Sequence, residues 1–294
     1  MPAPSLKEGD RRRVSIFNGR GLPCLTPPPR ALPSQLEERD YWQLKMTSPI
    51  TNPGIPLAEE LRRQSEQDAS VTPMDAVADA ARNGKLSDDQ CFKLLGRLWT
   101  LKRLMYYVYG GWAQGINLNE YPPAVAYLFG KQIYDESTHE MQFADEILRR
   151  RFVRSQKQLF AHPHSQFRTA TRTGAYIFCL RALANYPQNI RLAALNLGPK
   201  VVELAWTERF ARECPDEALH ALFQSQLAET RSHVLMGRLQ VERFVQKAVD
   251  IELAKRLCAE TRRDYLFFLE ETARFVLGLE EEKAGEVMVA ADID

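Results

Sequence analysis

The sequence predicts an all-α fold, a bundle of long helices, and two observations support this prediction. Several stretches of about 20 to 30 residues repeat apolar side chains at three- and four-residue steps, which is the spacing of one helix face. No segment shows the alternation of a strand, a glycine-rich phosphate loop or a Ser/His/Asp arrangement. With 294 residues and 45% hydrophobic content the chain can bury a large core, and one domain with flanking arms fits better than two domains.

Residues 1–57 are expected to form an extended arm, because they contain Pro27-Pro28-Pro29 and further prolines without a sustained period. Scattered aromatic residues such as Trp42 favour packing of this arm along the domain or on a partner subunit. The helical bundle is expected at 58–280. The acidic tail 281–294 is expected to fray.

Two short helices are expected first, at 57–68 and 73–83, and the second stops at Asn83-Gly84. The first long helix begins at Ser87-Asp88-Asp89-Gln90, which has the pattern of a capping box. Its end is expected at Gly110-Gly111, because glycine is a poor helix former.

The second long helix starts at Pro122-Pro123 and runs to about Phe152, which is long enough to cross a whole bundle. Four further helices follow from the apolar periodicity and the Gly-Pro and Cys-Pro boundaries. They are expected at about 166–184, 198–214, 216–247 and 249–278.

Composition limits the partners and the compartment. The net charge is only +1, from 39 basic and 38 acidic residues, so neither nucleic acid nor an anionic membrane is an expected partner. The five cysteines are an odd number without a Cys-x-x-Cys pair, which favours reduced thiols. Because no run of 18 apolar residues and no signal-peptide pattern occurs, a soluble, cytoplasmic protein is expected.

A possible metal-binding motif lies in the second long helix, at Glu136 and His139. The two residues are three positions apart, so on a helix they point to the same side, where a carboxylate and an imidazole can share one iron or manganese ion. An imperfect copy, Gln226 to His233, matches the first segment at its glutamine, its acidic residue and its histidine. The alternative is two unrelated buried histidines, but both copies continue an apolar stripe, which favours a present or former metal site.

Each copy has a partner position 30 residues before its histidine. Before His233 this position is Glu203, a carboxylate in an apolar segment, where an unpaired charge is costly. Before His139 it is Tyr109, and in the second copy Thr230 stands where the first has Glu136. The chain is therefore interpreted as a duplicated helix pair, in which Tyr109 and Thr230 replace two carboxylates.

The helix order and the spacing of a lone Glu and a Glu-x-x-His motif resemble the ferritin-like superfamily over residues 87–250. Within it the resemblance is to carboxylate-bridged di-iron oxygenases: phenylacetyl-CoA epoxidase, multicomponent monooxygenases and the ribonucleotide reductase small subunit. The resemblance implies a ferritin-like bundle that binds one or two iron ions, with manganese as an alternative. The implied metal ligands are Glu136, His139, Glu203 and His233, with Glu229 as a replacement ligand or as the counterpart of Asp135, which holds a ligating histidine.

The resemblance implies two main functions. The first is a metal-dependent oxidase or monooxygenase that uses O2 and an external or partner-supplied reductant on a small apolar or aromatic substrate, with Tyr109 and Thr230 as candidate catalytic residues. The second is a non-catalytic partner subunit of a multicomponent oxygenase with a degenerate metal site. Iron storage is disfavoured by the long arm, and a radical-generating reductase subunit by Phe143 at the expected tyrosine position. A homo-oligomer or a complex with another subunit is expected in either case.

Overall fold

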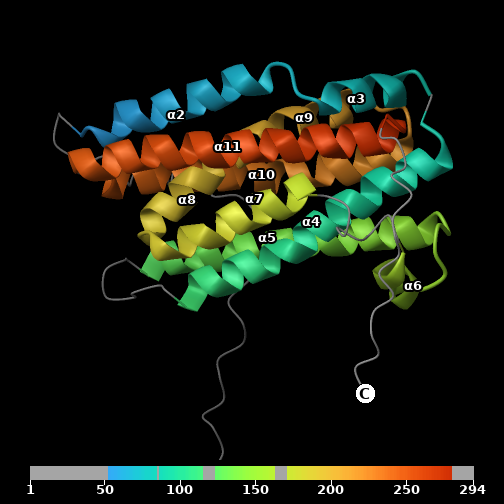
Figure 1. Ribbon diagram of the computed structural model, residues 1–294, viewed down its shortest axis with the longest axis horizontal. Helices are drawn as coiled ribbons and strands as arrows, with labels where there is room; N and C mark the ends of the chain where they lie inside the picture. Colours follow the sequence, from blue (N-terminus) through green and yellow to red (C-terminus); the bar gives the residue numbers. More distant parts are fainter. Residues whose placement is uncertain (1–51, 85, 115–122, 163–170, 280–294) are drawn as a thin grey trace, which may run out of the picture. The chain divides into compact units, whose positions relative to one another are not determined.

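The computed structural model describes residues 52–84, 86–114, 123–162 and 171–279, all within the compact unit Ser48–Asp294. Every regular element in these ranges is helical, so the all-α prediction is confirmed (Figure 1). Most of the predicted arm and the whole acidic tail lie outside the described residues. None of the described helices is both long and apolar enough to cross a membrane.

The helices follow the predicted order closely. The shorter elements are α2 Gly54–Ala69, α3 Met74–Arg82, α6 Gln156–Ala161, α7 Thr171–Ala182, the 3-10 turn η2 Leu183–Asn185, α8 Gln188–Asn196 and α9 Pro199–Glu213. The long helices are α4 Asp88–Gln114, α5 Pro123–Arg149, α10 Glu217–Phe244 and α11 Ala248–Leu277.

Local signals fix several of these boundaries. The predicted capping box is present, because Gln90 N donates to Ser87 Oγ and Ser87 N donates to Gln90 Oε1. Asp216 caps α10 by accepting from two backbone N–H groups of its first turn. Gly278 ends α11 in the left-handed region, with φ of 70°.

The predicted end of the first long helix at Gly110-Gly111 is wrong, since α4 continues to Gln114. A glycine inside a helix costs only about 1 kcal/mol relative to alanine. The flanking side chains Tyr109 and Trp112 are fully buried and pack edge to face, with ring centroids 5.9 Å apart. Their burial on both sides of the glycines favours continuation of the helix.

Helix α8 was not predicted. All its residues are buried, and it packs on α10, α11 and α9. Gly237 of α10 permits this approach, because a Cβ there would lie 2.5 Å from Asn196 Cβ. Four of its nine residues are polar but buried, namely Gln188, Asn189, Arg191 and Asn196, so the sequence pattern does not mark a solvent-facing side.

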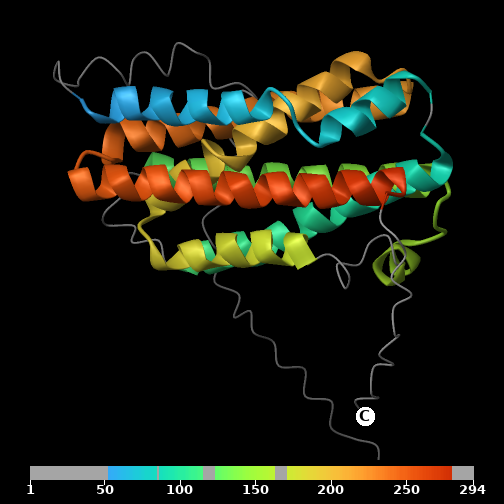
Figure 2. The same ribbon diagram turned by 45° about the horizontal axis from the view of Figure 1, so that its top comes forward.

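Two helix pairs build the framework of the site. Helix α5 packs antiparallel to α4, α10 packs on α9, and α5 also contacts α10. Figure 2 shows α2 and α7 on opposite sides of α11, and α11 contacts both of them. The two sequence motifs, on α5 and α10, are thereby brought together in the interior.

Candidate functional site

Two lysines and two glutamates form a closed set of ion pairs in the interior, called here the lysine–glutamate ring: Lys102 of α4, Glu136 of α5, and Lys200 and Glu203 of α9. Lys102 Nζ lies 2.7 Å from Glu136 Oε2 and 2.5 Å from Glu203 Oε1. Lys200 Nζ donates to Glu136 Oε1 and lies 2.7 Å from Glu203 Oε2. Each ammonium group therefore bridges both carboxylates, and all four carboxylate oxygens accept from a lysine.

The ring is electrically neutral and almost completely shielded from water, since the exposed fraction of each of its members is 6% or less. Burial lowers the pKa of Lys102, but the charges of Glu136 and Glu203 outweigh burial and raise it above its usual value. Burial likewise raises the pKa of Glu136 and Glu203, but the two lysines outweigh it and hold both below the usual range, Glu136 well below. The ion pairs thus keep Lys102 and both carboxylates charged at neutral pH.

The two motif histidines lie next to the ring in different environments. His233 Nε2 lies 3.1 Å from Asp135 Oδ2, and its Nδ1 lies 3.4 Å from Glu136 Oε1. Asp135, held ionised by His233 and by Lys131, accepts a hydrogen bond from the Nε2–H group of the neutral imidazole.

His139 is almost fully buried, and neither of its ring nitrogens has a hydrogen-bond partner in the described part of the chain. Burial, assisted by the positive charge of Lys102, lowers the pKa of His139 to about 3. Burial also lowers the pKa of His233, against the opposing effect of Asp135. Both rings are therefore neutral at pH 7.

The structure brings together only part of the predicted site. Glu136, Glu203 and His233 are in contact, directly or through a lysine. Thr230 is buried, but its hydroxyl donates to the backbone oxygen of Gln226 in its own helix. Glu229 is half-buried, and its Oε2 has no hydrogen-bond partner among the described residues.

Tyr109 lies beside the ring, but it does not contact Glu136. The α4 side chain that contacts Glu136 is Lys102, about two turns earlier in the helix. The Tyr109 hydroxyl accepts from Gln132 Nε2 at 3.3 Å. Burial, followed by the charge of Glu136, raises its pKa well above the usual value, so the phenol is protonated. Gln132 also exchanges two hydrogen bonds with Asn196 of α8, of 2.9 and 3.1 Å.

Lys102 and Lys200 were missed from the sequence. The motif search considered carboxylates and imidazoles, whereas a lysine within a helix is usually a solvated cation. A signal was present for Lys200, because it stands three residues before Glu203 at the start of an apolar run, which places both on one helix face. Lys102 also stands on an apolar stripe, four residues after Leu98 and three residues before Met105, which places it on the buried face of its helix.

The arrangement does not fit a bound metal ion. No group of three or more His, Cys, Asp or Glu side chains in the described ranges is placed to hold one. A divalent cation between Glu136 and Glu203 would compete with two ammonium groups and leave excess positive charge in a buried volume. Iron and manganese therefore stay predictions from the sequence, and no chemical step is assigned to them.

In comparisons with known proteins, no family model, no curated protein and no solved structure matches this chain.

Proposed function

We propose that this chain is a non-catalytic subunit of an oxygenase-type assembly, in which the lysine–glutamate ring takes the place of a metal centre. The single observation that carries this proposal is the use of all four carboxylate oxygens of Glu136 and Glu203 by the ammonium groups of Lys102 and Lys200. The oxygenase context rests on the sequence resemblance.

The energetics support a structural role for the ring. Leaving two carboxylates without counter-ions in the interior costs several kcal/mol for each ion. Lys102 and Lys200 supply these counter-ions from α4 and α9, so they join three helices without an exchangeable ligand. A bundle held together in this way keeps its shape without metal, and its surface carries its function.

Two observations favour the other candidate function, a metal-dependent oxidase. A buried imidazole with two unpartnered nitrogens, as at His139, is unusual, because buried polar groups normally find partners. A histidine held by a carboxylate, as His233 is by Asp135, is also typical of metal ligands. In this candidate Glu136, Glu203, His139 and His233 would hold iron or manganese, after both ammonium groups had moved away.

Metal analysis tests the proposal. Protein expressed in medium supplemented with iron and manganese should contain much less than one transition-metal ion per chain, and His139→Ala or His233→Ala should not change this content. Treatment with a chelator should leave the unfolding midpoint unchanged. One or two ions per chain, lost in both histidine variants, would instead support the oxidase.

A gain-of-function variant sharpens this test. Lys102→Glu combined with Thr230→Glu supplies a carboxylate from α4 and completes the second Glu-x-x-His motif, so it should bind at least one ion per chain. Arg103→Glu with Thr230→Glu is the matched control, because Arg103 is half-exposed and pairs with Glu140 outside the ring. Equal metal content in both double variants would contradict the role assigned to Lys102.

A further inference from the structure

Helix α5 exposes large side chains at seven-residue intervals: Tyr127, Tyr134 and Met141. Their exposed fractions are 51%, 71% and 62%, in a helix that packs on α4, α10 and α6. A seven-residue repeat of exposed aromatic or apolar groups is the pattern by which one helix packs along another. This face of α5 therefore lacks a packing partner within the described residues.

Small residues alternate with these large ones. Gly130, Ser137 and Ala144 each stand three residues after a large side chain, and along α5 they change from exposed through half-buried to buried. A Cβ at Gly130 would meet no atom within 4 Å in the described chain, so nothing inside this unit requires a glycine there. An exposed glycine within a helix costs about 0.5 to 1 kcal/mol relative to alanine.

We propose that α5 packs against α5 of a second copy of this chain, antiparallel and about a two-fold axis. In the register where Tyr134 faces Ser137 of the second copy, Tyr127 faces its Ala144 and Met141 faces its Gly130. Met141 then enters the open space at Gly130, and Tyr127 reaches the cavity that Ala144 lines. Tyr134 lies against the half-buried Ser137, and the same contacts recur on both sides of the axis. This proposal goes beyond the proposed function and does not depend on it.

Self-complementarity identifies a second copy rather than a different partner. The order large, small, large, small, large, small matches its own reverse, so one helix supplies both halves of the interface. Lys131 and Glu140 already form ion pairs within the chain, with Asp135 and Arg103, so the antiparallel direction rests on the matching of large and small side chains.

The exposed large side chains supply a substantial part of a dimer interface. The neighbours Tyr106 of α4, which is 37% exposed, and Phe160 of α6, which is 44% exposed, extend the patch. Taking roughly 200 Å² for each large side chain, the exposed parts of the five residues amount to on the order of 500 Å². This is more than half of the roughly 800 Å² that each partner buries in a standard interface.

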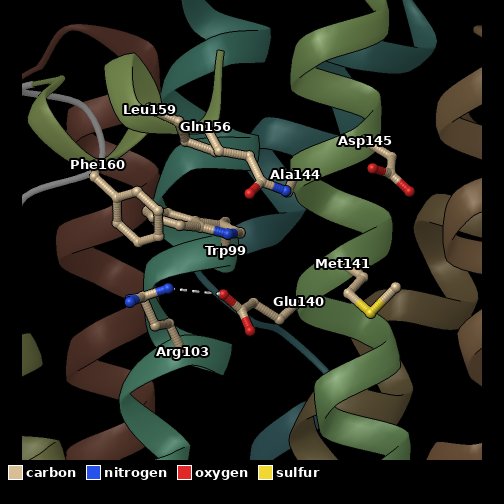
Figure 3. A pocket seen from close by; sticks show the side chains of 9 residues that line it. All are labelled: Trp99, Arg103, Glu140, Met141, Ala144, Asp145, Gln156, Leu159 and Phe160. Atoms are coloured by element: carbon tan, nitrogen blue, oxygen red, sulfur yellow. Dashed lines mark hydrogen bonds and ion pairs between the residues drawn. The ribbon is translucent and has the colours of Figure 1, made fainter. Parts of the chain in front are cut away.

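A cavity of about 220 Å³ lies where the register places Tyr127 of the second copy (Figure 3). Trp99, Phe160 and Ala144 line it, and Arg103 lies 4.0 Å from the Phe160 ring centroid and pairs with Glu140. Met141 and Asp145 of α5 complete the wall. A tyrosine ring fits a cavity of this size, and its hydroxyl can donate to the carboxylate of Glu140 or Asp145.

Molar mass measured by light scattering tests the interface. At micromolar concentration the chain should have twice its 33.7 kDa mass. Tyr134→Glu places a charge at the centre, and Gly130→Leu fills the gap opposite Met141, so each should raise the dimer dissociation constant at least tenfold. Gly174→Leu on α7 is the matched control, because a Cβ there also meets nothing within 4 Å in the described chain, and it should stay dimeric.

Disulfide formation tests the register. In Gly130→Cys/Met141→Cys the new thiols are 11 residues apart in one helix, about 16 Å, which is too far for a bond within one chain. Oxidation should therefore link two chains in the double variant, and neither single variant should cross-link, which also controls for the native cysteines.

Three results would overturn the proposal. They are a monomeric wild type, a dimer whose dissociation constant is unchanged by Tyr134→Glu and Gly130→Leu, and cross-linking that is equal in the single and double cysteine variants. Each concerns molar mass or cross-linking, whereas the proposed function is tested by metal content. The two can therefore fail separately.

Discussion

The two faces of α5 reverse the usual distribution of polar and apolar residues. The inner face buries Gln132, Asp135, Glu136 and His139, whereas the outer face exposes Tyr127, Tyr134 and Met141. On the inner face most polar groups have found partners: lysines for Glu136, an amide for Gln132 and an imidazole for Asp135. On the outer face the large side chains have none in the described part of the chain.

This difference shows that one helix meets two separate requirements. A buried polar face is stable only where neighbouring helices satisfy it, so the inner face requires specific residues on α4, α8, α9 and α10. An exposed aromatic face is retained where something outside the folded unit covers it. The predictions below change one face at a time, with a matched change elsewhere.

The largest effect is expected on the inner face, from Lys102→Met. Removing this ammonium leaves two buried carboxylates with one counter-ion, so the free energy of unfolding should fall by about 3 to 5 kcal/mol. The control Arg103→Met removes a neighbouring cation that is 43% exposed and should cost less than about 1 kcal/mol. Urea denaturation at pH 7 measures both values, and equal losses would show that the ring does not stabilise the core.

Gln132→Leu tests the second polar contact of the inner face. The substitution removes the hydrogen-bond partner of both the amide oxygen and the amide nitrogen of Asn196. A buried polar group without a partner lowers the free energy of unfolding by about 1 to 3 kcal/mol. On the outer side of the same helix, Thr138→Ala removes only a hydroxyl bonded to its own backbone turn and should change stability by less than about 0.5 kcal/mol. A Gln132→Leu loss as small as that of Thr138→Ala would contradict this account.

Acid sensitivity should come from the buried histidines. The folded pKa of His139 is about 3, below the usual histidine value of 6.5, so unfolding is accompanied by proton uptake between these values. The contribution of the uncharged His139 imidazole to the free energy of unfolding is fully present above about pH 6.5. It is lost as the pH falls, by about 1.4 kcal/mol per pH unit. His233, whose pKa is also lowered, adds to this loss.

His139→Gln should therefore flatten the dependence of stability on pH between 5.5 and 4.5 by about 1.4 kcal/mol per pH unit. The ring glutamates, whose folded pKa values are lowered, take up protons on unfolding as the pH falls toward 4.5, but they do so equally in the wild type and the variant and cancel in the comparison. Denaturant titrations at several pH values measure the slope. Parallel curves for the wild type and the variant would mean that His139 takes up no proton on unfolding.

The sequence predicted the all-α class, most helix boundaries and the burial of Glu136, His139, Glu203 and His233. These features rest on periodicity and on capping residues, which act over a few positions along the chain. The sequence did not predict that Lys102 faces Glu136, because this depends on how α4 is rotated against α5. Helix α8 was not predicted for a related reason, because its burial depends on the helices that surround it.

The smallest effect is expected on the outer face, and its sign distinguishes the two faces. Gly130→Ala adds a Cβ into open space and reduces the freedom of the unfolded chain, so a monomer should gain about 0.5 to 1 kcal/mol in stability. On α10, Gly237→Ala should destabilise instead, because its Cβ would lie 2.5 Å from Asn196 Cβ.

If a second copy covers Gly130, the added methyl group also crowds Met141 across the two-fold axis. The gain from Gly130→Ala should then appear in denaturation at nanomolar concentration and shrink or change sign at concentrations well above the dimer dissociation constant. A gain of the same size at both concentrations would show that Gly130 remains exposed in the dimer, and the interface would have to be sought on another face.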